Sequence, residues 1–136
     1  MDPLDMDCVR DMLILIEQET YVKFSGRSVT MRMKHIYPIL DQYDSIQKFE
    51  AAKYIFGKNL VEYDKKNLPN GPRFYVCTGL SPLGHDFLRA VRDDSVWKSM
   101  KSSGKSLDSM TVNKLIELAV QTVSIAVFKS LPLRQK

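Results

Sequence analysis

Residues that could act as acids, bases or nucleophiles are few in this chain of 136 residues. It contains two histidines, His35 and His85, of which His85 is followed by Asp86. Neighbouring residues on a helix point in different directions, so His85 and Asp86 make a weak acid–base pair. No nucleophile motif and no glycine-rich phosphate loop accompanies them. We therefore expect a protein without enzyme activity, catalytic residues or cofactor.

The two cysteines, Cys8 and Cys77, do not suggest a metal site. They lie far apart and form no Cys-x-x-Cys pair, which is the spacing that structural zinc sites use. We expect no bound metal and two free thiols, which are typical of a reducing cytoplasm. The longest apolar stretch, residues 115–128, is interrupted by Glu117 and Gln121 and is too short for a membrane span. Together with an acidic start that is unlike a signal peptide, this predicts a cytoplasmic protein without a membrane partner.

The sequence points more to a binding surface than to a catalytic or metal site, because charge is unevenly distributed along the chain. The net charge is +4, yet residues 1–20 carry −5, from six acidic residues and Arg10, so the remainder carries +9. This distribution allows a polyanion such as DNA to bind the later segments but not the first helix. A solvated surface without a polyanion partner fits an excess of this size equally well.

The first candidate for DNA contact is a helix predicted from Ile46 to Gly57, which would end with Gly57 as its C′ residue. Helical periodicity predicts that Ile46, Phe49, Ala52 and Phe56 face inward. The opposite face would contact the major groove or its phosphates through five side chains: Gln47, Lys48, Ala51, Tyr54 and Lys58. An acidic neighbour and the lack of arginine leave a merely solvated face as the alternative.

A second candidate is the loop between two predicted strands, residues 60–63 and 73–78. Its Asn-Gly step between prolines is strong turn chemistry. Three basic side chains flank this loop and could straddle a DNA backbone: Lys65, Lys66 and Arg73. An exposed polar loop tip is the alternative. Residues 21–34, expected to form two short strands, hold four basic and no acidic residues and could either extend the same surface or protect a sheet edge.

The stretch from Leu80 to Trp97 is expected to continue the return strand into a helix that packs back over the two strands. Ser81 is a good N-cap and Pro82 suits the first helical position. Gly84 in the first turn is unfavourable for a helix, so we expect a close backbone contact there. Asp93 and Asp94 would begin another short helix, with Trp97 as a core anchor.

The predicted fold class is α+β, as a winged helix-turn-helix with a small β-wing and an added C-terminal helix. Residues 1–100 would form the winged-helix domain, 101–109 a linker and 110–136 the C-terminal helix. That helix is apolar over much of its circumference, so it needs burial on two sides. We expect a homodimer through six of its residues: Leu115, Leu118, Ala119, Thr122, Val123 and Ala126. A helix packed into its own domain is the alternative.

Three stretches carry a resemblance to known proteins. Residues 6–17 form an acidic-then-apolar helix that ends in Ile-Glu, Asn59-Leu60-Val61-Glu62 is a helix-to-strand step, and residues 80–97 are the most specific part. In these features the chain resembles a family of short bacterial and phage proteins, domain-of-unknown-function family 2513, over roughly its whole length. Asn59 stands where that family usually has glycine. The resemblance implies a winged-helix-like fold and a phage or prophage setting, and it implies no reaction.

These observations lead to two hypotheses. The first is a winged-helix regulator or accessory protein that binds double-stranded DNA. The second is a non-enzymatic protein-binding module on the same scaffold, for example a phage product that inhibits a host protein.

Overall fold

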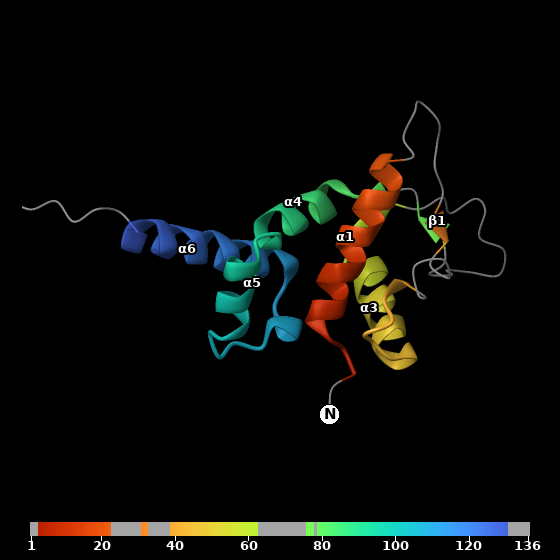
Figure 1. The fold of residues 1–136 in the computed structure, drawn as a ribbon, viewed down its shortest axis with the longest axis horizontal. Coiled ribbons are helices and arrows are strands. Elements are labelled where there is room, and N and C mark those ends of the chain that lie inside the picture. Colours follow the sequence, from red (N-terminus) through yellow and green to blue (C-terminus); the bar gives the residue numbers. More distant parts are fainter. Residues whose placement is uncertain (1–2, 23–30, 33–38, 63–75, 78, 131–136) are drawn as a thin grey trace, which may run out of the picture.

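Helices dominate the computed structural model of the chain, with a small amount of antiparallel sheet beside them (Figure 1). The structure describes residues 3–22, 31–32, 39–62, 76–77 and 79–130. In chain order, the elements are α1 (Met6–Val22), β1 (Met31–Arg32), α3 (Ser45–Gly57), β2 (Val61–Glu62), β3 (Val76–Cys77), β4 (Gly79–Leu80), α4 (Pro82–Val91), α5 (Asp94–Lys101), the 3-10 turn η3 (Leu107–Ser109) and α6 (Val112–Ser130). The predicted α+β class is confirmed.

The strands form two antiparallel pairs. β1 pairs with β3, with Met31 opposite Cys77, and β2 pairs with β4, with Val61 opposite Leu80. The predicted return strand is therefore divided between two partners and extends to Leu80. Gly79 stands at the start of the second pairing with φ of +152°, a conformation that glycine adopts much more readily than other residues.

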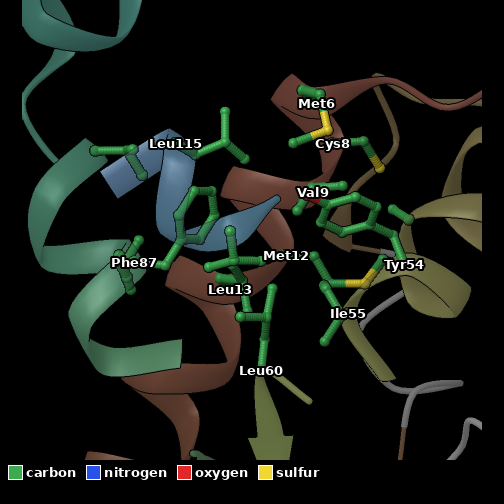
Figure 2. Packing of buried hydrophobic residues seen from close by; sticks show 14 of the residues in the cluster. Met6, Cys8, Val9, Met12, Leu13, Tyr54, Ile55, Leu60, Phe87 and Leu115 are labelled. Atoms are coloured by element: carbon green, nitrogen blue, oxygen red, sulfur yellow. The ribbon is translucent and has the colours of Figure 1, made fainter. Parts of the chain in front are cut away.

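Helix α1 lies at the centre of the core. Val9, Met12, Leu13 and Ile16 are fully buried. α1 packs against α3 on one side and against β4 and α4 on the other. Figure 2 shows the side chains of Val9, Met12 and Leu13 between Ile55 of α3 and Phe87 of α4. The central helix therefore connects the two halves of the fold.

The end of α3 differs from the prediction. Gly57 is the last helical residue, and the left-handed conformation falls on Asn59, with φ of 59°. The Asn59 amide donates to the Phe56 carbonyl at 3.2 Å, and the Leu60 amide donates to the Ile55 carbonyl at 3.0 Å. These two bonds form a Schellman motif, in which asparagine is the usual substitute for glycine.

The start of α4 agrees with the prediction. The Ser81 hydroxyl accepts a hydrogen bond from the Gly84 amide at 3.0 Å and donates to the Asn59 carbonyl at 2.6 Å. Pro82 is the first helical residue. A Cβ atom on Gly84 would lie 1.9 Å from the Leu60 carbonyl oxygen, so the expected close backbone contact is present. The contact holds the first turn of α4 against the residue that precedes β2.

Helix α6 begins inside the core. Leu115 and Ala119 are fully buried, and Leu118 is nearly so, where α6 packs against α4 and α5. The prediction that these three residues form a dimer interface is wrong, because their own chain already covers them. Thr122 is half-buried and Val123 is exposed, whereas the side chain of Ala126 lies outside the described residues.

The segment before α6 also contributes to the core. Leu107, within the predicted linker, is buried in the same cluster as Val112 and Leu115. The division into a domain of residues 1–100 and a separate C-terminal helix stays a prediction, but the two share this core. In the part of the chain that the structure describes, no helix has both the length and the hydropathy to cross a membrane.

Two glycines offer a test of this packing. Gly84→Ala places a methyl group into the Leu60 carbonyl, so we expect it to lower the free energy of unfolding by about 1–3 kcal/mol or more. Gly57→Ala meets open space in a helix, so it should raise that free energy by roughly 0.5–1 kcal/mol. Urea denaturation of both variants measures the difference. Equal effects of the two substitutions would contradict the close contact at Gly84.

Candidate nucleic-acid interface

Helix α3 begins with a complete capping box. The Asp44 carboxylate accepts from the Gln47 amide at 2.7 Å, and the Gln47 side chain accepts from the Asp44 amide at 3.0 Å. Asp44 is therefore the N-cap of the helix. Gln47 also donates to Asp5, which directly precedes α1, at 3.4 Å. The side chain proposed as a base reader is therefore already engaged in holding the start of its own helix.

The predicted outward face of α3 is wrong at its centre. Ala51 is fully buried and Tyr54 is only 8% exposed, whereas Ile46 and Phe49 are 62% and 41% exposed. Ala51 and Tyr54 cannot reach a DNA groove in this fold. Burial raises the pKa of Tyr54 to about 12, with the charge of Asp108 as a second cause, so its hydroxyl stays protonated at neutral pH.

The buried face of α3 is rotated about the helix axis relative to the predicted one, and this difference has a physical reason. The helix carries apolar residues on both sides, so its periodicity alone does not choose the inner face. Ala51 and Ala52 are both fully buried, and small side chains at a helix–helix contact allow the axes to approach closely. The adjacent alanines are the one signal in the sequence that pointed to this face.

Two exposed cations belong to this region: Lys53 on α3 and Lys58 at its C-cap. The Lys53 ammonium lies 3.3 Å from a Glu50 carboxylate oxygen and 5.5 Å from the centre of the Phe49 ring. The Lys58 ammonium lies 5.6 Å from the centre of the Tyr54 ring. Lys53 was not among the side chains predicted to contact DNA. Lys48, which was among them, is half-buried. Both exposed cations are at the surface, where they can rearrange to meet a phosphate at small cost.

The β1–β3 ladder joins two basic segments of the chain. Residues 23–34 hold four basic and no acidic residues, and residues 63–75 hold three basic residues and one aspartate. β1 lies within the first segment and β3 directly follows the second, so the pairing brings residue 32 opposite residue 76. The predicted loop contacts Lys65, Lys66 and Arg73 themselves lie outside the described residues.

Two acidic residues of α1, Asp7 and Glu17, are paired with cations of the later chain. Asp7 accepts from the Trp97 indole at 2.6 Å and from Lys101 at 2.8 Å. Glu17 accepts two hydrogen bonds from Arg92, at 2.6 and 2.8 Å. Trp97 is buried, as expected of a core anchor. Asp7 and Glu17 therefore tie the first helix to the α4–α5 region.

Arg10 is the buried basic residue of the same helix. Its guanidinium donates to the Val91 carbonyl at 2.8 Å, to the Arg92 carbonyl, and to the Asp94 carboxylate at 2.7 Å. It also lies 5.8 Å from the centre of the Trp97 ring. Asp93 caps α5 by accepting from the amides of residues 95 and 96, as predicted. Arg10 thus binds the end of α4 and the start of α5 together.

The remaining candidates for chemistry are dispersed. His85 and Asp86 are both exposed, and the nearest acid to the imidazole is Glu17, 3.8 Å from Nδ1. Cys8 and Cys77 are free and buried, and burial raises the pKa of each thiol to about 12. For Cys8, the charges of Asp5 and Asp11 add to the effect of burial. Within the described ranges, no three histidine, cysteine or carboxylate side chains gather as a metal site.

One family model matches the chain. It is described as Hypothetical protein (DUF2513) and covers residues 3–111. The chain belongs to the DUF2513 family. The residues of this DUF2513 protein that the family model matches include Asp7, Arg10 and Trp97, and they end directly before α6. No curated protein and no solved structure matches the chain.

The contact of Asp7 with Trp97 and Lys101 predicts a pH dependence. Burial acts to raise the pKa of Asp7, but the hydrogen bonds from Lys101 and Trp97 and the charges of Lys101 and Arg10 lower it below 3.8. A carboxylate with a lowered pKa stabilises the fold at neutral pH, and this stability is lost as the pH falls through the folded pKa.

We expect Asp7→Asn to lower the free energy of unfolding at pH 7 by roughly 1 kcal/mol, because screening limits a carboxylate that is 40% exposed. The difference from the unchanged protein should shrink as the pH falls below about 4. Denaturation curves at several pH values measure it. Asp86→Asn, at a more exposed carboxylate, is the control, and a pH-independent effect of Asp7→Asn would contradict the ionic contribution.

Proposed function

We propose that this DUF2513 protein is a winged-helix regulator or accessory factor that binds double-stranded DNA in a phage or prophage setting, without enzyme activity. The observation that carries the proposal is the β1–β3 ladder, which joins two basic segments. In chain order α1, β1, α3, β2 and β3 supply a helix, a strand, a helix and two further strands, and in the proposed winged helix residues 63–75, between β2 and β3, would supply the wing. A homodimer would present two such surfaces to the DNA.

The contacts proposed for DNA are mostly phosphate contacts. On α3 they are Lys48 and Lys53, and Lys58 follows at its C-cap. Ala51 and Tyr54 are excluded by their burial. The loop adds Lys65, Lys66 and Arg73. Lysine supplies charge to the phosphate backbone but little base discrimination, so this set favours binding with weak sequence preference.

Charge reversal tests the proposal. We expect the double variant Lys53→Glu/Lys66→Glu to bind every duplex more weakly, because two phosphate contacts are lost. The slope of log affinity against log salt should become shallower by about 0.9 for each contact. Fluorescence anisotropy of a labelled random duplex at several salt concentrations measures both quantities.

The matched control reverses two exposed lysines of α5 and α6, Lys98→Glu/Lys114→Glu. It changes the net charge equally and should leave more of the affinity intact. Equal losses in the two double variants would indicate a general charge effect, and no binding at low salt would overturn DNA binding.

The exposed apolar residues of α3 support a second candidate, a protein-binding module. Ile46 and Phe49 lie one turn apart on the outer side of the helix, and Lys53 follows at the next turn. Exposed apolar residues at helical spacing are a common anchor for a partner's groove. The matching partner would present an apolar groove with an acidic rim to receive Lys53.

We expect Ile46→Ala/Phe49→Ala to abolish capture of such a partner from host lysate while leaving DNA affinity unchanged. Both side chains are exposed, so the free energy of unfolding should change by less than about 0.5 kcal/mol for each substitution. Lys53→Glu/Lys66→Glu serves as the comparison in the same pull-down. A partner that is captured equally well by all three proteins would contradict this surface.

A further inference from the structure

The outer face of α3, the helix proposed to contact DNA, is apolar at its start. The exposed residues of this helix are Ser45, Ile46, Phe49, Lys53 and Gly57. With 3.6 residues per turn, these five positions fall within about one third of the helix circumference. Ile46 and Phe49 are 62% and 41% exposed. A partner that meets the first two turns of α3 from this side therefore meets two large apolar side chains.

The structure describes every residue of α3, and few of its polar side chains remain to read a base edge. Gln47 is held in the capping box and by Asp5. The Lys53 ammonium lies 3.3 Å from a Glu50 carboxylate oxygen. The hydroxyl of Ser45 both donates and accepts, so it does not select one base. Discrimination between bases is left to the apolar pair.

The major groove of DNA offers one apolar group to such a pair, the C5-methyl group of thymine. The other groups by which base pairs differ there are hydrogen-bond donors and acceptors. Helical residues three apart have Cβ atoms about 5–6 Å apart, and successive bases of a strand rise by about 3.4 Å. Ile46 and Phe49 can therefore cover the methyl groups of two neighbouring thymines.

The order of residues along α3 fits this orientation. In a recognition helix, the residues near the N-terminus contact the base edges. Ile46 and Phe49 lie in the first two turns of α3, Lys53 follows one turn later, and Lys58 stands at the C-cap. The apolar pair would thus reach the base edges, while the cations further along the helix meet the phosphates that border the groove.

We infer that Ile46 and Phe49 contact the C5-methyl groups of thymine and give this DUF2513 protein a preference for thymine-containing sites. The inference rests on the DNA binding proposed above and adds the base that α3 selects. Each methyl group that is covered should raise the affinity by roughly fourfold, because its apolar surface leaves water. The lysine contacts add affinity that is nearly independent of sequence.

A duplex that differs only in its methyl groups tests the inference. Fluorescence anisotropy at low salt compares an A·T-rich duplex with the same duplex in which deoxyuridine replaces thymidine. The unchanged protein should bind the thymine duplex more tightly by roughly fourfold for each covered methyl group. Ile46→Ala/Phe49→Ala should bind both duplexes equally. The control Val120→Ala/Ile125→Ala removes two exposed apolar side chains from α6 and should keep the preference.

The outcomes separate this inference from the function on which it rests. Salt-dependent binding of the unchanged protein to both duplexes with equal affinity would overturn the methyl contact alone. A thymine preference that persists in Ile46→Ala/Phe49→Ala would also overturn it, and this is the result that the protein-binding candidate predicts. No binding to either duplex at low salt would overturn DNA binding and the inference together.

Discussion

The structure depends on the buried guanidinium of Arg10. A helix ends with carbonyl groups that have no partner within the helix, and a buried end needs other donors. Arg10 supplies them to Val91 and Arg92 at the end of α4, and the same side chain holds Asp94 in the first turn of α5. A buried charge is tolerated only when it is paired and hydrogen-bonded, so this arrangement fixes the angle between the two helices.

The polar and apolar sides of α1 therefore have separate tasks. Asp7, Arg10 and Glu17 bind Lys101, Asp94 and Arg92 of the α4–α5 region, while the buried residues of α1 pack against α3. Two of the six acidic residues of the first segment, Asp7 and Glu17, take part in this contact. The surplus of positive charge falls on the later chain, and the β1–β3 ladder gathers part of it at one place.

The framework of α1 and α4 separates two ends of the molecule. In Figure 1, α6 extends from one end of the molecule, and β1 and α3 lie toward the other. The candidate nucleic-acid interface on α3 and the β1–β3 ladder is therefore remote from the free end of α6.

Local chemistry in the sequence determined the helix starts and the central helix. The caps at Asp44, Ser81 and Asp93 use side chains that bond amides two or three residues away, so no distant partner is needed to predict them. The close contact at Gly84 was also foreseeable, because glycine in a first helical turn is unfavourable without one.

Only the tertiary structure decided the faces of α3 and α6. Both helices carry apolar residues on several sides, and a periodic pattern gives no direction when the opposite faces are alike. For α3, contact with α1 selected Ala51 and Tyr54 for burial and left Ile46 and Phe49 outside. For α6, α4 and α5 cover the first half and end before the second. The elements that pack against each helix determine which face is buried, and these elements lie far away in the sequence.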